Sequence, residues 1–177
     1  MRKSTQFIAF AGVGLLLAGC GSTALTSYLK QNAPWASIQR VAVLPFAVPS
    51  ENPVQRELVT QLFSQELRKT GTVEVVEVPI DSPVGSGLAD FKQLAKEYRV
   101  DAVLSGSIDD TRGTIIHLSF QDVATQEVLW SGSYLLGSRS EFFSFSTQQQ
   151  QFQRGFHRLV DLFVSESGVK GPVAASS

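Results

Sequence analysis

The chain has 177 residues, 15 Lys+Arg, 16 Asp+Glu and a formal net charge of −1. This length suits one domain with a hydrophobic core, and the near-neutral charge argues against a nucleic-acid-binding protein. The single cysteine, Cys20, excludes an internal disulfide, and with only two histidines a zinc site is not predicted.

The N-terminal residues carry the most specific signal in the sequence. Arg2 and Lys3 precede an apolar or small stretch over residues 7–19, which is too short for a membrane-spanning helix but typical of a secretory signal peptide. Leu17-Ala18-Gly19-Cys20 resembles the bacterial lipobox. That resemblance implies that residues 1–19 are removed and that Cys20 receives acyl chains such as palmitate. Two or three chains make a lasting membrane anchor, whereas one binds only marginally.

The mature chain is predicted to hold a lipidated Cys20 and flexible tether (20–38), one domain (39–167) and a disordered tail (168–177). Removal of Arg2 and Lys3 leaves 13 basic against 16 acidic residues, so neither nucleic acid nor a polybasic lipid contact is predicted. Gly21 and Ser22 follow the cysteine without an aspartate, which by resemblance to lipoproteins of two-membrane bacteria implies the periplasmic face of the outer membrane.

The first half of the domain alternates strands and helices. Residues 40–46 form an apolar run typical of a strand buried on both faces. Asn52 and Pro53 form a cap and first helical position, and Gly71 ends that helix. A second strand is predicted over 73–78, a second helix over 88–98 and a third strand over 100–108.

The second half predicts a hairpin ladder and a last helix. Residues 109–113 and 122–127 are turns that flank an alternating strand at 116–121, and a fifth strand runs over 128–136. A long helix with a phenylalanine-rich stripe begins near Thr147. The predicted fold is therefore α/β (α+β) in the order β-α-β-α-β-β-β-α, with helices packed on a single mixed sheet whose last three strands are antiparallel.

No catalytic site is predicted, so the chain is not expected to be an enzyme. His117 falls on the outward face of a strand and His157 on the polar side of a helix, far apart in sequence. Asp109-Asp110 has the composition of a turn more than of an acid/base pair, and the glycines at 85–87 lack a phosphate-binding motif. No cofactor is expected beyond the covalent lipid on Cys20.

The stretch 141–145 (EFFSF) places Phe142, Phe143 and Phe145 between the last strand and the last helix. Clustered aromatics in a loop mark an interface if they are exposed, and otherwise form core. On a lipid-anchored domain such an interface is lipid or a neighbouring subunit.

Several motifs together resemble one family. They are the strand RVAVLPF at 40–46, the strand YRVDAVLSGS at 98–107 and the hairpin DVATQEVLWS at 122–131. This pattern is similar to the CsgG/LpoB/PelC superfamily of outer-membrane lipoproteins over residues 38–165. Gln126 departs from the family, which often has glycine at that turn.

The members of this superfamily have different functions. CsgG-type channels add long amphipathic hairpins, for which no residues remain here, and LpoB-type activators use a long Pro-rich linker. The layout resembles PelC-type lipoproteins most. That resemblance implies an oligomeric ring in exopolysaccharide secretion and biofilm formation, which guides polymer to an outer-membrane exporter through an acidic aperture. Asp109, Asp110, Asp122 and Glu127 are the candidate aperture residues, with solvated turns as the alternative.

Two alternatives to this function stay open. One is an LpoB-like activator of a peptidoglycan synthase, and the other is a generic envelope assembly scaffold. The sequence does not decide subunit number, partner or polymer.

Overall fold

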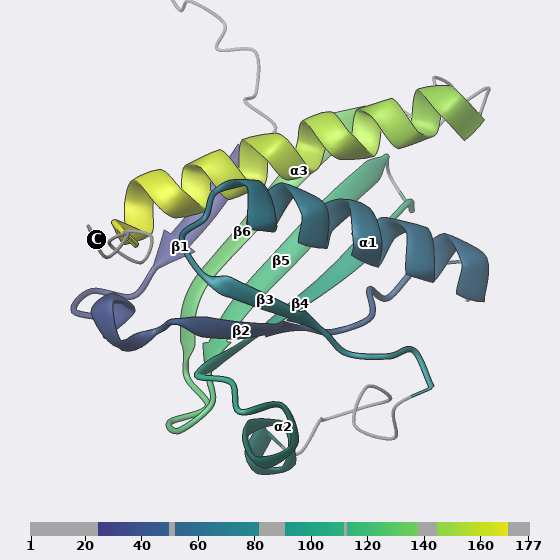
Figure 1. The fold of residues 1–177 in the computed structure, drawn as a ribbon. Coiled ribbons are helices and arrows are strands. Elements are labelled where there is room, and N and C mark those ends of the chain that lie inside the picture. Colours follow the sequence, from purple (N-terminus) through teal and green to yellow (C-terminus); the bar gives the residue numbers. More distant parts are fainter. Residues whose placement is uncertain (1–24, 50–51, 82–90, 112, 138–144, 170–177) are drawn as a thin grey trace, which may run out of the picture.

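The computed structural model describes residues 25–49, 52–81, 91–111, 113–137 and 145–169. Within these ranges, no helix is long and apolar enough to cross a membrane. The elements in chain order (Figure 1) are β1 Leu25–Leu29, the short 3-10 helix η1 Trp35–Ser37, β2 Arg40–Val43, α1 Pro53–Lys69, β3 Glu74–Glu77, α2 Phe91–Tyr98, β4 Ala102–Asp109, β5 Thr114–Asp122, β6 Val128–Gly137 and α3 Phe145–Ser167.

The strands form one six-stranded mixed sheet in the order β1-β6-β5-β4-β2-β3. β2 lies parallel to β3 and β4, whereas β4, β5, β6 and β1 pair antiparallel. The α+β class, the single mixed sheet and the element order from β2 to α3 are therefore confirmed. α3 begins at Phe145, slightly before the predicted Thr147, and residues 88–90 of the predicted second helix lie outside the described residues.

The N-terminal segment differs from the prediction. Leu25–Leu29 is an edge strand that pairs with β6, where a flexible tether was expected over residues 20–38. The expected tether is therefore wrong from Leu25 onward. Farther along, the Trp35 ring meets those of Phe120 and Phe163 at centroid distances of 5.5 Å each. Polar residues dominate this N-terminal segment, so its composition resembles that of a linker. Its few apolar side chains nevertheless pack on the core.

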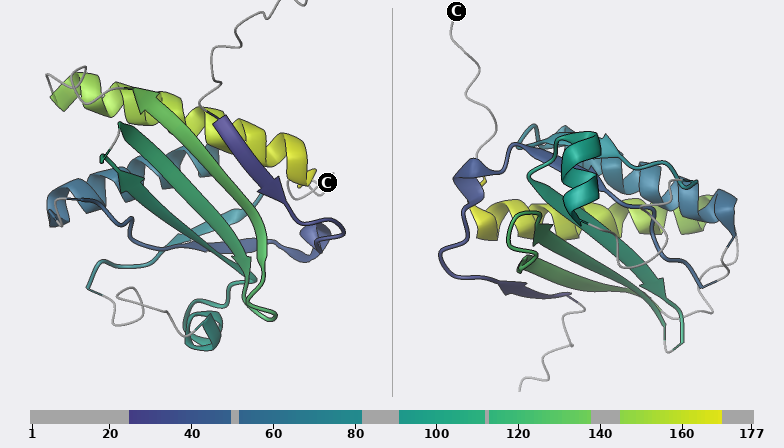
Figure 2. Two further views of the ribbon diagram at one scale, coloured as in Figure 1. Left: turned by 180° about the vertical axis from the view of Figure 1, so that it is seen from behind. Right: turned by 90° about the horizontal axis from the view of Figure 1, so that it is seen from below.

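The helices cover the two faces of the sheet unequally. α1 and α3 lie side by side on one face and bury the main core, which includes Phe46, Phe63, Phe156 and Trp130. α2 covers part of the other face, over β2 and the start of β4. The remainder of that face, over β5, β6 and β1, carries no helix of the described chain (Figure 2).

The boundaries of α1 follow from local chemistry. Asn52 Oδ1 accepts a hydrogen bond from Val54 N at 3.0 Å, and Pro53 occupies the first helical position, where a missing N–H costs nothing. After Thr70, Gly71 adopts φ +63°, a left-handed conformation that glycine adopts without strain. Both ends of this helix agree with the sequence prediction.

Candidate functional site

The four predicted acidic residues lie at two opposite ends of the sheet. Asp109 and Asp110 occupy the turn between β4 and β5, whereas Asp122 and Glu127 flank the turn between β5 and β6. The intervening β5 has nine residues, so the two turns are about 27 Å apart at the usual rise of a strand. One chain therefore does not bring the four carboxylates together.

Asp122 helps to form the second turn. The residue is 8% exposed, and Oδ1 accepts hydrogen bonds from Thr125 N at 2.7 Å and Thr125 Oγ1 at 3.0 Å. Gln126 in the same turn has φ +61°, the left-handed conformation that the glycine common in the family would adopt more easily. Gln126 thus takes up the left-handed position in this turn.

Glu127 is paired with a cation. Its Oε2 accepts a hydrogen bond from Lys30 Nζ, and Lys30 directly follows β1. The hydrogen bond and the positive charge of Lys30 lower the pKa of Glu127 below its ordinary value. This ion pair joins the end of β1 to the turn that precedes β6.

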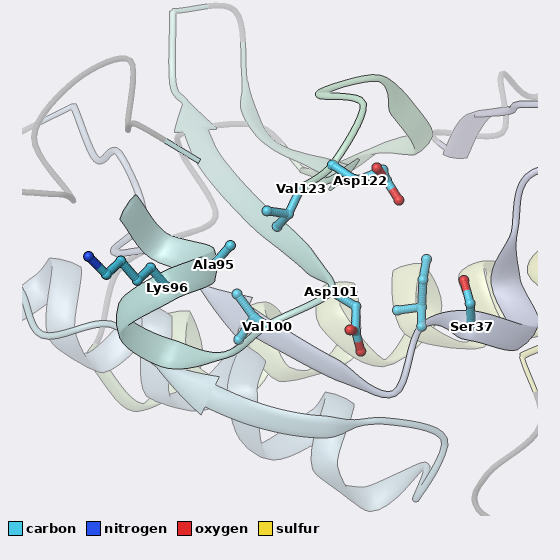
Figure 3. A pocket seen from close by; sticks show the side chains of 9 residues that line it. Ser37, Ala95, Lys96, Val100, Asp101, Asp122 and Val123 are labelled. Atoms are coloured by element: carbon cyan, nitrogen blue, oxygen red, sulfur yellow. The ribbon is translucent and has the colours of Figure 1, made fainter. Parts of the chain in front are cut away.

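An open hollow of about 670 Å³ lies at the same end of the sheet (Figure 3). Nine residues line it: Ser37, Ile38, Ala95, Lys96, Val100, Asp101, Asp122, Val123 and Ala124. Asp101 Oδ2 accepts hydrogen bonds from Gln39 N and Arg40 N, both at 2.9 Å, and so fixes the start of β2. Lys96 extends away from both carboxylates in Figure 3. Both carboxylates thus accept hydrogen bonds from backbone N–H groups.

The opposite turn is built by its own aspartate. Asp109 Oδ1 accepts a hydrogen bond from Thr111 N at 2.9 Å, which is the geometry of an Asx turn. Asp110 borders a small hollow of about 70 Å³ together with Thr114 and Gln148, the latter from the first turns of α3. Asp109 therefore helps to form this turn.

The histidines take the positions predicted for them. His117 lies on the uncovered face of the sheet, where Nδ1 is 2.8 Å from Ser133 Oγ. His157 is exposed on α3, with Nε2 at 3.3 Å from Asp161 Oδ2 and Nδ1 at 3.8 Å from Glu66 Oε2. Across the described residues, no three His, Cys, Asp or Glu side chains gather where they could hold a metal ion.

No family model matches this chain, and no curated protein matches it in sequence. Solved structures match it in fold. A variant of PelC from Paraburkholderia phytofirmans, solved as a dodecamer, aligns at TM-score 0.57 and 16% identity over 82% of this chain and 98% of that one. A second PelC dodecamer from the same organism aligns at TM-score 0.54 and 17% identity, over 76% and 95%. The chain therefore has the PelC fold.

The LpoB C-terminal domain from Salmonella enterica aligns less fully, at TM-score 0.42 and 17% identity over 54% of this chain and 80% of that domain. The likeness thus rests on the PelC structures, and the family resemblance read from the sequence is confirmed at the level of fold. At these identities, the comparison carries no site residue from PelC to this chain.

Several predicted residues lie where the structure gives no site geometry. Cys20, Phe142 and Phe143 are outside the described residues, and Phe145 is the first residue of α3, with no side-chain environment described. Sequence reasoning also missed Lys30 and Asp101. Lys30 lies in the stretch whose composition predicts a tether, and Asp101 lies inside a strand motif, so neither carries a separate signal.

Proposed function

We propose that this chain is an outer-membrane-anchored periplasmic lipoprotein, without catalytic activity, that forms an oligomeric ring in an exopolysaccharide secretion apparatus and guides polymer to the exporter. The observation that carries the proposal is the PelC fold, which spans 82% of the chain and 98% of a solved PelC subunit. Both PelC structures are dodecamers, which supports an assembly of several subunits.

The chemistry of the described residues supports a role without bond making or breaking. Asp101, Asp109 and Asp122 accept hydrogen bonds from main-chain N–H groups of their own surroundings. His117 and His157 lie on different elements that face different sides of the sheet. An electrostatic role requires only that charge be presented at a surface, as Glu127 does in the exposed part of its turn, whereas Asp122 is buried.

The distance from the proposed anchor to the domain favours a position close to the membrane. From Cys20 to Leu25, where β1 begins, the chain spans at most about 18 Å. An LpoB-like activator that reaches across the periplasm would need a far longer linker between its lipid and its domain. The short connection therefore supports the PelC-like function over that alternative.

The anchor is tested by Cys20→Ser in the full chain. We expect this variant to be lost from the outer-membrane fraction, because the acyl chains provide the affinity for that membrane. Fractionation of the cell envelope measures this. If the variant stays in the outer membrane and keeps the mass of the parent chain, the lipid on Cys20 is excluded as the anchor.

The acidic aperture is tested one end at a time, because the two turns lie at opposite ends of the sheet. Asp109→Asn with Asp110→Asn removes charge at one end, and Asp122→Asn with Glu127→Gln removes it at the other. We expect one pair to reduce export of the polymer, with Glu57→Gln on the exposed side of α1 as the matched control. Normal export in both pairs would remove all four residues from the mechanism.

The three phenylalanines Phe142, Phe143 and Phe145 are proposed to contact lipid or a neighbouring subunit. Their replacement by serine is expected to weaken membrane contact or assembly while the melting temperature stays near that of the parent chain. Lost stability with unchanged assembly and membrane contact would instead assign them to the core.

A further inference from the structure

The two edges of the sheet differ in how they are protected against pairing with a further strand. The β3 edge carries Glu74 and Glu77, whose carboxylates pair with Arg40 and Arg68, and Pro79 follows closely. Charges and proline on an edge discourage a further strand from pairing there. β1 (LTSYL) has neither a charge nor a proline. The five residues of β1 therefore lack these protections, and the charged Lys30 that follows them pairs with Glu127.

The hydrogen-bond register shows which groups of β1 point outward. Lys30 N donates to Leu129 O at 2.8 Å, and Leu29 stands opposite Trp130. Because pairing alternates along an antiparallel ladder, Thr26 and Tyr28 direct their N–H and C=O groups toward β6. Leu25, Ser27 and Leu29 direct theirs away from the sheet, where the described chain supplies no further strand.

The residue pattern of β1 is symmetric about its centre. Ser27 is the middle residue, with a leucine at each end of the strand and polar residues between. Turned by 180°, a second β1 would place Leu25 opposite Leu29, Thr26 opposite Tyr28 and Ser27 opposite itself. Apolar side chains would then meet apolar ones on the helix-covered face, and no like charges would stand opposite each other. The strand is thus complementary to a second copy of itself.

We propose that the free edge of β1 pairs antiparallel with β1 of a second copy of this chain, about a two-fold axis at Ser27. The outward N–H and C=O groups of Leu25, Ser27 and Leu29 would form about six main-chain hydrogen bonds. The pairing joins two six-stranded sheets into one continuous sheet. In Figure 2, β1 forms the margin of the sheet at which this addition takes place.

This contact goes beyond the proposed ring. A two-fold contact closes after two subunits, so a larger assembly needs a second, different surface as well. The lipid on Cys20 is not required for the pairing. The strand contact and the proposed function can therefore fail independently.

The side chain of Ser27 permits a selective test. Its hydroxyl donates to Glu166 Oε1 at 2.7 Å, and Trp130 Nε1 donates to Oε2 of the same glutamate at 2.8 Å. The hydroxyl therefore points to the helix-covered face, whereas the N–H of Ser27 points to the edge. Ser27→Pro removes that N–H and blocks the edge, and an edge strand tolerates proline when the lost N–H faces outward. Ser27→Ala removes the hydroxyl alone and is the matched control.

The first experiment measures mass by light scattering on the mature chain in detergent, over a range of protein concentrations. We expect Ser27→Ala to keep the mass of the parent assembly and Ser27→Pro to lower it, with the melting temperature of each variant confirming that it folds. Equal mass for all three chains, or a parent chain that stays monomeric, would overturn the proposal. An equal loss of mass in Ser27→Ala and Ser27→Pro would also overturn the proposal, because the Ser27 hydroxyl, and not its N–H, would then hold the assembly together.

The second experiment uses disulfide formation in the cell envelope. Directly opposed residues of a hydrogen-bonded pair have Cα atoms about 5.5 Å apart, which is within reach of a disulfide. We expect Ser27→Cys to give a dimer of this chain on oxidation, and Glu74→Cys on the β3 edge to give none. A band linked to a different protein, or no band, would overturn the second copy as occupant. A dimer in the parent chain would instead show a free Cys20 thiol and so contradict the proposed lipidation.

Discussion

At the scale of single residues, Gly106 in β4 allows the core to close over the sheet. A Cβ atom at this position would lie 2.2 Å from Phe46 Cε1. The Phe46 ring is fully buried and packs against Phe63 and Phe156, each at a centroid distance of 5.5 Å. The ring therefore has little space into which it could move.

We predict that Gly106→Ala lowers the free energy of unfolding by about 1–3 kcal/mol, the usual cost of overpacking a dense core. Thermal unfolding followed by circular dichroism measures the change. Ser105→Ala on the opposite face of the same strand is the control, with an expected change within about 0.5 kcal/mol. A Gly106→Ala chain as stable as the parent would show that the rings around Phe46 rearrange freely.

The exposed ion pair between Lys30 and Glu127 predicts the direction in which the stability of the folded chain changes with pH. The Lys30 ammonium lowers the pKa of Glu127, so the folded chain favours the charged carboxylate. The contribution of this carboxylate to stability is then present above its unfolded pKa of about 4.3, and is lost as the pH falls through the lower folded value. Replacing Lys30 by methionine should return the pKa of Glu127 toward the ordinary range.

Titration of the Glu127 carboxyl carbon by NMR measures this shift. Because the ion pair is exposed, added salt should reduce the shift of the Glu127 pKa in the parent chain. In Lys30→Met, added salt should have little effect on that pKa. An unchanged pKa in Lys30→Met would show that another group is responsible. Such a result would also remove this ion pair as a connection between the end of β1 and the turn before β6.

At the scale of elements, Thr60 fixes α1 to the segment that follows β2. Phe46 N donates to Thr60 Oγ1 at 3.0 Å, and the hydroxyl donates to Arg56 O at 2.7 Å. We predict that Thr60→Val destabilises the chain by about 1–3 kcal/mol, because the buried N–H of Phe46 loses its partner. Thr60→Ser keeps the hydroxyl and should be less destabilising. Chemical denaturation of both variants checks the order, and a Ser variant less stable than the Val variant would contradict it.

Elements with several independent signals were predictable from the sequence, and β1 was not. α1 has a cap, a proline at its start, a periodic apolar face and a glycine at its end, and all four agree. β1 is five residues long, and only its two end residues, Leu25 and Leu29, are partly buried. Its stability comes from pairing with β6, about 105 positions later in the chain. A local pattern does not contain that contact.

At the scale of the whole molecule, the family motifs indicated the fold because each lies on a central element of the sheet. The motifs at 40–46 and 98–107 fall on β2 and β4, and the third falls on the β5–β6 turn. The separation of the acidic pairs also follows from the predicted meander, because successive turns of a meander lie at opposite ends. The hydrogen bonds of Asp101 and Asp122 to the backbone required the structure, since they join segments far apart in sequence or depend on turn geometry.

The arrangement of the sheet predicts a gradient of amide exchange. β5 lies between two antiparallel partners, neither of which is an edge strand, so its amides should exchange most slowly, and the edge strands β1 and β3 should open first. Within β1, the amides of Thr26 and Tyr28 bond to β6 and should be slower than those of Ser27 and Leu29. Pairing with a second copy at the β1 edge reduces this difference in exchange rate, because it protects only the outward amides of Ser27 and Leu29.

Hydrogen exchange of the mature chain at two protein concentrations measures both effects. On dilution we expect faster exchange at Ser27 and Leu29, with unchanged exchange at Thr26, Tyr28 and throughout β5. Ser27→Pro should leave the Leu29 amide fast at every concentration, since the second copy no longer covers it. Equal protection of inward and outward amides at all concentrations would mean that a segment of the same chain, rather than a second copy, lies along this edge.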